Sequence, residues 1–385
     1  MKVEEQLVKL VSIPSFVDKT NNEKMLGEYL LERLYEIYPT LPAVKQYVTK
    51  ERFNVYVKQE SPKLFVIGHI DTVQPSSNWK TDPFRPLIRD GNLYGLGAWD
   101  MKGSLAAFLT ALENVKKEID LTKLSMLFYV DEEYDFLGMK KFVEKKPVLK
   151  PKLVLSLDGT EKLRSGCRGL IELDLEIIGK SGHSSKPFNG VNAITSTTEI
   201  VKTLEKEMMN ITNKELGYCT VNLAYLQGGK ISKSKNQIEW KREGNVIPDY
   251  TDCTIEIRTT DKKVDAASII SKLKEISRSV GVKINVKRTR HNIIPWKCAN
   301  REAVTEEIKE IYKQCSLSFS LEDIQFSGYV DIGMLEGVIT APKYTIGVSG
   351  DNAHAPNEYA IIKSLYNAQK IYEKILKKYC QEEIL

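Results

Sequence analysis

The chain has 385 residues, which is long for one domain, and a prior of about 100–200 residues per domain predicts two. Its 42% hydrophobic and 28% charged residues exclude a disordered or collagen-like chain, and a net charge of +5 from 56 basic and 51 acidic residues is too small to indicate nucleic-acid binding. The sequence has no apolar run near the roughly 20 residues of a membrane helix and no secretory-signal pattern at its start, so we expect a cytoplasmic protein without a membrane partner.

The first part of the chain alternates helical patterns with apolar strand-like runs. The expected helices are 1–38 (one or two), 101–117 and 136–144, and the expected strands are 54–58, 63–67, 124–130 and 152–157. Alternation of strand and helix is typical of an α/β fold, so we predict a mainly parallel sheet with helices on both faces.

The pattern changes near residue 164. Six elements follow in the order strand, helix, strand, strand, helix, strand: 169–178, 191–208, 219–226, 252–258, 264–280 and 283–287. This is the order of the ferredoxin-like split unit, which can bury its own core. We therefore predict an inserted α+β domain at 164–290 within a first domain formed by 1–163 and 291–385. The polar stretch 230–243 is expected to be a solvated loop or an extended β-ribbon.

The first domain resumes near residue 292. A helix is expected at 302–314, a short strand at 344–346 and a long amphipathic helix at 359–377, with a Gly-rich stretch at 327–337.

Metal-capable side chains lie at strand ends or helix starts of this first domain, or in its polar loops. The candidates are His69, Asp100, Glu133, Asp158 and His354. Ligands bind at such ends in α/β sheets. Two imidazoles with three carboxylates suit a pair of divalent metals of the zinc type with one carboxylate bridging, whereas magnesium or calcium would favour oxygen ligands alone.

Two further acidic residues near these candidates, Glu132 and Asp71, bear on the chemistry. In the pair Glu132-Glu133, one carboxylate can bind metal while its neighbour acts as a proton shuttle. Asp71 can accept the ring N–H of His69 and fix its tautomer. The residues alone therefore predict a two-metal hydrolase. His291 fits no such pattern, and we assign it no role.

Several segments, in order along nearly the whole chain, resemble those of a known family. It comprises dizinc amidohydrolases and peptidases that include acetylornithine deacetylase, succinyl-diaminopimelate desuccinylase, aminoacylase and glutamate carboxypeptidase. The matching segments are GHIDTV (68–73), LYGLGAWDMKG (93–103), DEEYDFLGMK (131–140), LSLDGT (155–160), GKSGHSSKPFNGVNAI (179–194), GNVIPD (244–249), IEIR (255–258) and NAHAPNEY (352–359).

The resemblance implies roles for the residues of the first domain. His69 and Asp158 would bind one zinc, Glu133 and His354 the other, and Asp100 would bridge the two; cobalt or manganese could replace zinc. Glu132 would be the general base, taking a proton from a metal-bridging water and handing it to the leaving amine, and Asp71 would orient His69.

The resemblance also implies roles for the inserted domain. His183 would donate to the substrate carbonyl as an oxyanion donor, often from the other subunit, which implies a homodimer and an insert that serves as a dimerisation and lid domain. Asn245 and Arg258 match positions that hold the carboxylate end of the substrate.

Three features depart from the family pattern. Asp158 stands where the deacylases and carboxypeptidases more often carry Glu, and Asp there is commoner in peptidases that recognise a free amino terminus. The insertion 230–243 precedes Asn245, and SGYVDIGML (327–335) lacks the usual Gly-Gly-Thr-Asp run although it retains Asp331.

We therefore predict a hydrolase of small N-acyl amino acids, similar to a deacetylase or desuccinylase of amino-acid biosynthesis. The alternative is a dipeptidase or aminopeptidase acting on small peptides with a free amino terminus. A non-catalytic amino-acid binding protein on the same scaffold would have lost a ligand or the base, yet all six residues are present.

Overall fold

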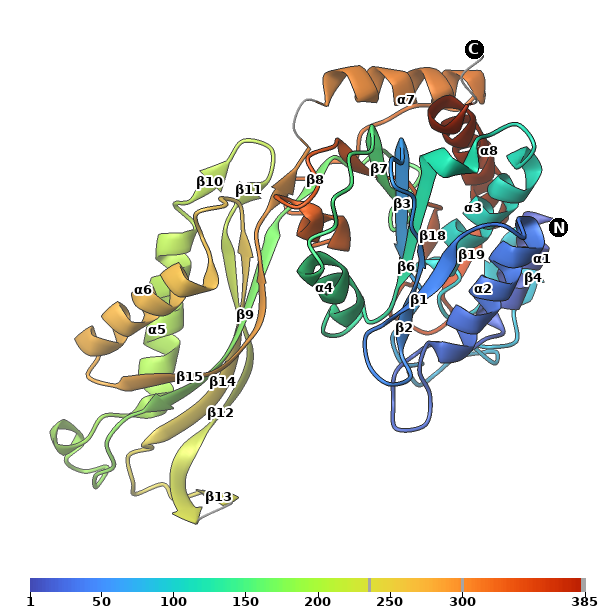
Figure 1. The fold of residues 1–385 in the computed structure, drawn as a ribbon. Coiled ribbons are helices and arrows are strands. Elements are labelled where there is room, and N and C mark those ends of the chain that lie inside the picture. Colours follow the sequence, from blue (N-terminus) through green and yellow to red (C-terminus); the bar gives the residue numbers. More distant parts are fainter. Residues whose placement is uncertain (235–236, 299–300, 382–385) are drawn as a thin grey trace. The chain divides into compact units, whose positions relative to one another are not determined.

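The computed structural model describes residues 1–234, 237–298 and 301–381 (Figure 1). The chain divides into two compact units: unit 1 comprises Met1–Ser165, Lys297–Asp323 and Val330–Leu385, and unit 2 comprises Gly166–Trp296 and Ile324–Tyr329. No helix of the described residues is long and apolar enough to cross a membrane.

Unit 1 is built on a six-stranded sheet in the order β1-β2-β6-β3-β7-β17. Its strands are β1 (Ala43–Tyr47), β2 (Phe53–Val57), β3 (Leu64–His69), β6 (Leu124–Tyr129), β7 (Leu153–Ser156) and β17 (Lys343–Thr345). β3 pairs in parallel with β6 and β7, and β7 with β17, whereas β1 and β2 form an antiparallel edge. The predicted mainly parallel sheet is confirmed. Its strands β3, β6 and β7 are fully buried and mostly apolar, as is typical of strands in a sheet that helices cover on both faces.

Helices cover both faces of this sheet (Figure 1). They are α1 (Val3–Val11), α2 (Lys24–Ile37), α3 (Lys102–Val115), α4 (Leu137–Glu144), α7 (Glu302–Gln314) and α8 (Ile362–Cys380). Phe65 of β3 contacts Phe142 of α4, with ring centroids 5.5 Å apart. On the opposite face, Phe128 of β6 contacts Phe108 of α3 at 6.2 Å. Aromatic pairs of this kind anchor one helix to each face.

A smaller four-stranded sheet of unit 1 has the order β18-β19-β5-β4. Its strands are β4 (Leu87–Arg89), β5 (Asn92–Tyr94), β18 (Gly350–Asp351) and β19 (Tyr359–Ile361). β5 pairs antiparallel with β19, so the loop that follows Tyr94 and the loop that precedes Tyr359 leave the sheet side by side. These two loops carry Asp100 and His354.

Unit 2 contains a five-stranded antiparallel sheet in the order β13-β12-β14-β9-β15, together with two helices. Its elements are β9 (Gly169–Ile178), α5 (Ala193–Met208), β12 (Thr220–Ser234), β13 (Gln237–Lys241), β14 (Tyr250–Thr259), α6 (Ala266–Ser279) and β15 (Lys283–Ile293). Without β13, the strands lie in the order β12-β14-β9-β15. Counted along the chain, these are the second, third, first and fourth strands, which is the strand order of a ferredoxin-like unit. Residues that alternate along β9 and β14 pack with α5 and α6 into a separate apolar core.

The polar stretch 230–243 forms a β-ribbon where it is described. β12 continues to Ser234 and pairs antiparallel with β13, which begins at Gln237, while residues 235–236 lie outside the described part of the chain. The described residues also include four short strands: β8 (Gly166–Cys167), β10 (Thr212–Asn213), β11 (Gly217–Tyr218) and β16 (Trp296–Lys297). Whether unit 2 acts as a lid or dimerisation domain stays a prediction.

Candidate metal centre

The candidate ligands of unit 1 are placed by the ends of three parallel strands and by the paired loops of the smaller sheet. His69 is the last residue of β3, Glu133 follows β6, and Asp158 follows β7. The carboxyl ends of parallel strands meet at one edge of a sheet, which is why residues far apart in sequence lie together there. Asp100 precedes α3, and His354 lies between β18 and β19.

The structure brings all five predicted ligands and Glu132 together. Ligand atoms lie within 4.8 Å of one another in each of three groups: His69 with Asp100 and Asp158, His69 with Glu132 and Glu133, and Asp100 with Glu133 and His354. The carboxylate of Asp100 lies between the two imidazoles, with Oδ1 at 3.1 Å from His69 Nε2 and Oδ2 at 3.2 Å from His354 Nε2. His354 Nε2 is also 3.1 Å from Glu133 Oε1.

The electrostatics of this cluster favour a bound cation. Burial raises the pKa of Glu133 to about 7 and the pKa of Glu132 well above its usual range, and neighbouring carboxylates add to both shifts. Burial and the nearby Asp100 raise the pKa of Asp158. Hydrogen bonds to Asp100 and Glu133 raise the pKa of His354 to about 10. Asp100 is the exception: against the effect of burial, hydrogen bonds with His354 and His69 hold its pKa below the usual range. The other carboxylates, crowded together and buried, hold protons unless a positive charge replaces them.

The donor set fits a pair of divalent metal ions. Imidazole nitrogens and carboxylate oxygens converge from two sides on Asp100, whose two oxygens face different histidines. Zinc accepts this mixture of nitrogen and oxygen ligands. The individual metal-binding roles of these residues stay predictions.

Asp71 contacts His69 mainly through its backbone and not, as expected, through its carboxylate. It is fully buried, and His69 Nδ1 lies 3.1 Å from its backbone carbonyl oxygen and 3.7 Å from carboxylate Oδ1. The nearer acceptor for the ring is thus the main chain. The carboxylate accepts the backbone N–H of Glu132 at 3.0 Å and that of Glu133 at 2.9 Å. Asp71 therefore fixes the turn that carries both acidic side chains.

Glu358 is a supporting residue that the sequence reasoning missed. Its side chain is 1% exposed and accepts the backbone N–H groups of Gly97 at 2.8 Å, Trp99 at 2.9 Å and Asp100 at 3.0 Å. Three such bonds hold the loop in front of α3 in place, and with it Asp100. The available signal was the position of Glu358 at the end of the matching segment NAHAPNEY.

Asp331 is a second residue near the cluster to which the sequence reasoning gave no role. It is 1% exposed, and neither carboxylate oxygen has a hydrogen-bond partner among the described residues. Burial raises the pKa of Asp331 well above its usual range, against the opposing effect of His69, and the charge of Asp158 raises it further. Its charge is in turn the largest contribution from a neighbouring group to the raised pKa of Glu132.

The predicted residues of the inserted segment lie in unit 2. His183 is exposed and pairs with Val246 in a β-bridge, and the carbonyl of Asn245 accepts the N–H of Ser184 at 2.9 Å, so His183 and Asn245 share one loop cluster. Arg258 lies on β14, where its Nε donates to Glu256 at 2.9 Å.

His291, to which we assigned no role, is buried on β15 with Nε2 3.8 Å from a carboxylate oxygen of Glu172. Its buried position in the sheet of unit 2 indicates a structural role.

Comparison with known proteins gives one family match over most of the chain. The sequence model described as "Peptidase family M20/M25/M40" matches residues 65–378. An acetylornithine deacetylase of Buchnera aphidicola subsp. Schizaphis graminum is 25% identical over 391 residues, covering 99% of this chain and 98% of that protein. A succinyl-diaminopimelate desuccinylase of Pelagibacter ubique is 26% identical over 348 residues, covering 85% of each.

Solved structures share the fold. An M20 family metallo-carboxypeptidase from Sulfolobus solfataricus has a TM-score of 0.76 at 19% identity, covering 98% of this chain and 99% of that one. A tripeptidase from Staphylococcus aureus has a TM-score of 0.73 at 22% identity, covering 98% of both chains. A dinuclear metal-binding peptidase from Bacillus subtilis has a TM-score of 0.68 at 13% identity, covering 98% of this chain and 97% of that one.

Proposed function

The chain belongs to peptidase family M20/M25/M40 and is a metal-dependent amidohydrolase, and on this basis we propose that it hydrolyses the amide bond of a small N-acyl amino acid. The observation that carries the proposal is the convergence of His69, Asp100, Asp158, Glu133 and His354 beside Glu132. The named activities of the relatives, removal of an acetyl or succinyl group from an amino acid, give the substrate class. A cytoplasmic location remains a prediction from the sequence.

We propose zinc as the metal, with cobalt or manganese as alternatives. His69 and Asp158 would hold one ion, Glu133 and His354 the other, and Asp100 both. When bound, the ions polarise the amide carbonyl and make water a stronger nucleophile at neutral pH. Glu132 accepts the proton of that water and delivers it to the leaving nitrogen. The backbone of Glu132 is held by Asp71, so the base stays in place during both transfers.

A peptidase acting on a free amino terminus is the second candidate. It is favoured by Asp158, which stands where deacylases of this family more often carry Glu, and by the fold shared with a tripeptidase. The N-acyl amino acid hydrolase and the peptidase would use the same metal chemistry. They differ in the substrate, which carries an acyl group in the first case and a free amino terminus in the second.

Unit 2 supplies the proposed substrate contacts. His183 would stabilise the oxyanion, and Asn245 and Arg258 would bind the substrate carboxylate. Asn245 lies just before the start of β14 and Arg258 near its end, so these two residues of one chain lie far apart in unit 2 and would have to come from different subunits of a dimer. Arg258 already pairs with Glu256, so a substrate carboxylate would share or displace that ion pair. We also propose a homodimer in which unit 2 mediates the contact and closes over the substrate. Size-exclusion chromatography with light scattering tests the dimer, and a monomer with full turnover would refute it.

A substrate panel tests the function. The metal-loaded protein is incubated with N-acetyl- and N-succinyl-amino acids and with free-amino dipeptides, and released amine is measured. Turnover of the acylated amino acids is expected. Turnover of the dipeptides alone would make the peptidase reading correct, and no hydrolysis of any amide by a protein that retains its metal would favour a non-catalytic binding protein.

A further inference from the structure

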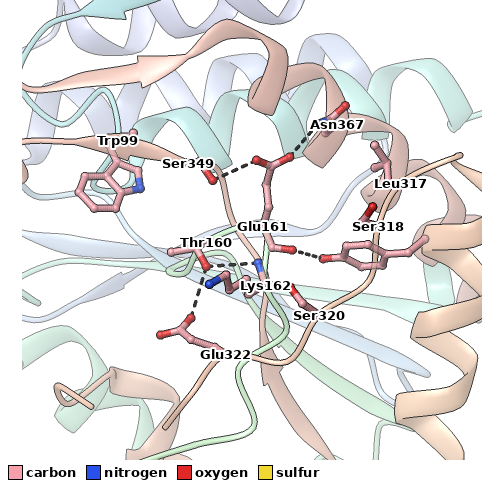
Figure 2. Close-up of a pocket in the computed structure, with 12 residues that line it drawn as sticks. Trp99, Thr160, Glu161, Lys162, Leu317, Ser318, Ser320, Glu322, Ser349 and Asn367 are labelled. Carbon is pink, nitrogen blue, oxygen red and sulfur yellow. Dashed lines mark hydrogen bonds between the residues drawn. The ribbon is translucent and has the colours of Figure 1, made fainter. Parts of the chain in front are cut away.

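Unit 1 contains a cavity of about 590 Å³ whose lining residues have no role in the proposed reaction (Figure 2). We call it the Glu161 cavity. Its walls come from the loop after β7, the stretch after α7 and the start of β18, with Asn367 of α8 at one side. A volume of this size is typical of small-molecule sites.

Glu161 is a carboxylate in this cavity whose side-chain hydrogen-bond donors, within the part of the chain that the structure describes, are both neutral groups. Its Oε2 accepts the hydroxyl of Ser349 at 3.0 Å, and its Oε1 accepts the side-chain N–H of Asn367 at 2.7 Å (Figure 2). No lysine, arginine or histidine nitrogen of the described residues lies within 4.0 Å of it, although the side chain is half-buried. A carboxylate has about four acceptor positions, so each oxygen retains capacity for a further donor.

The backbone around Glu161 is fixed. Its carbonyl accepts the hydroxyl of Tyr312 at 2.6 Å, and the carbonyl of Thr160 accepts the N–H of Gly347 at 2.7 Å. The backbone N–H of Lys162 donates to the hydroxyl of Thr160 at 3.2 Å. The carboxylate is therefore presented by a rigid wall, which lowers the entropy cost of binding.

The cavity also contains a cation, Lys162, that has no counterion among the described residues. Lys162 is exposed, and no carboxylate of the described residues lies within ion-pair distance of its Nζ. The other charged residue in the wall, Glu322, is already neutralised by Arg164, whose Nε donates to it at 2.9 Å. One negative and one positive group thus remain available.

We propose that the Glu161 cavity binds a free α-amino acid. The ligand's ammonium, with three N–H donors, would bind Glu161, and its carboxylate would bind Lys162. Trp99 and Leu317 offer apolar surface for its side chain. A zwitterion fits because an acidic and a basic side chain both line the cavity, and neither has a partner of opposite charge among the described residues. An amino acid released by the proposed hydrolysis belongs to the same class.

Isothermal titration calorimetry with the full-length, metal-loaded protein tests this site. The probes are L-leucine and L-lysine, together with L-leucinamide, which lacks the carboxylate, and 4-methylpentanoate, which lacks the amine. We expect saturable binding of the amino acids and binding about tenfold weaker or worse for both single-charge analogues. Equal binding of an analogue and L-leucine would overturn the proposal.

Variants separate this cavity from the metal centre. Lys162→Met and Glu161→Gln are expected to weaken L-leucine binding about tenfold, while Lys117→Met, an exposed lysine outside the cavity, leaves it unchanged. Retention of the wild-type affinity by Lys162→Met would refute the site, since binding would then occur elsewhere. Circular dichroism shows that each variant is folded. Because the assay does not use turnover, it is independent of whether N-acyl amino acids are the substrates.

Discussion

The buried carboxylate of Asp71 accepts the backbone N–H of Glu132 at 3.0 Å, and through its second oxygen it also binds the N–H of Glu133. One side chain at the end of β3 therefore positions the turn at the end of β6. This contact joins the proposed base to the strand that ends in His69, so the two halves of the site are fixed to each other.

Asp71→Asn should lower turnover more than it lowers stability. The amide of asparagine has only one acceptor oxygen, so its NH₂ group would face one of the two backbone N–H groups. Changes of this kind behind metal ligands typically cost about 10–100-fold in activity or metal affinity. Steady-state kinetics and metal analysis check the prediction. Asp120→Asn, which removes a surface carboxylate that accepts the N–H of Thr122, is the matched control and should leave kcat unchanged.

Glu132→Gln and Glu133→Gln should separate the proposed base from the proposed ligand. Loss of a general base typically costs about 10²–10⁴-fold, and we expect Glu132→Gln to lose turnover while it keeps both metal ions. Glu133→Gln should lose metal as well, because the neutral amide is a poorer ligand. Metal content is measured by atomic emission beside kcat. If Glu132→Gln kept full turnover, the base assignment would be wrong.

Local pattern was sufficient to predict most of the fold and the candidate ligands. Helix α7 begins and ends where its periodicity indicates, and His69 and Asp158 were found because polar residues end apolar strands. β1 (Ala43–Tyr47) was missed because it is a partly exposed edge strand with Lys45 and Gln46 in its middle. The antiparallel pairing of β2 with β6 joins Val55 to Phe128, residues far apart in the sequence, which no local pattern marks.

Two supporting residues could not be identified from such patterns. Glu358 acts on backbone N–H groups about 260 positions away along the chain, and no side-chain pairing in the sequence marks that contact. Asp331 lies in a short 3-10 helix, Asp331–Leu335, without the periodicity of a strand or an α-helix. The supporting contacts of both residues become visible only once tertiary packing brings the loops together.

Removal of metal should abolish hydrolysis without unfolding the chain. The apolar core of unit 1 does not include the ligands, so circular dichroism should be retained after exhaustive chelation while turnover is lost. Restoring zinc, cobalt or manganese separately and measuring kcat/KM identifies the metals that support catalysis. Hydrolysis that continues after chelation, with metal content shown to be below the enzyme concentration, would contradict the two-metal mechanism.

Arg52→Leu should destabilise the protein, and more at neutral than at acid pH. Arg52 binds both oxygens of fully buried Glu23, at 2.6 and 2.8 Å, and also contacts Asp131. Removing one partner of a buried pair typically costs about 3–5 kcal/mol.

The pH dependence follows from the pKa of Glu23, which burial raises above 4.5 while Arg52 opposes the rise. A raised folded-state pKa gives stability that is present below about pH 4.5 and is lost as the pH rises through the folded pKa. Without Arg52 that pKa moves higher, so the loss extends further toward neutrality. Urea unfolding at pH 5 and pH 8 measures the difference between variant and wild type, which should be larger at pH 8. Arg89→Leu, in an exposed pair with Asp90, should change stability by less than about 0.5 kcal/mol at both values. An Arg52→Leu deficit equal at the two pH values would show that Glu23 does not titrate in this range.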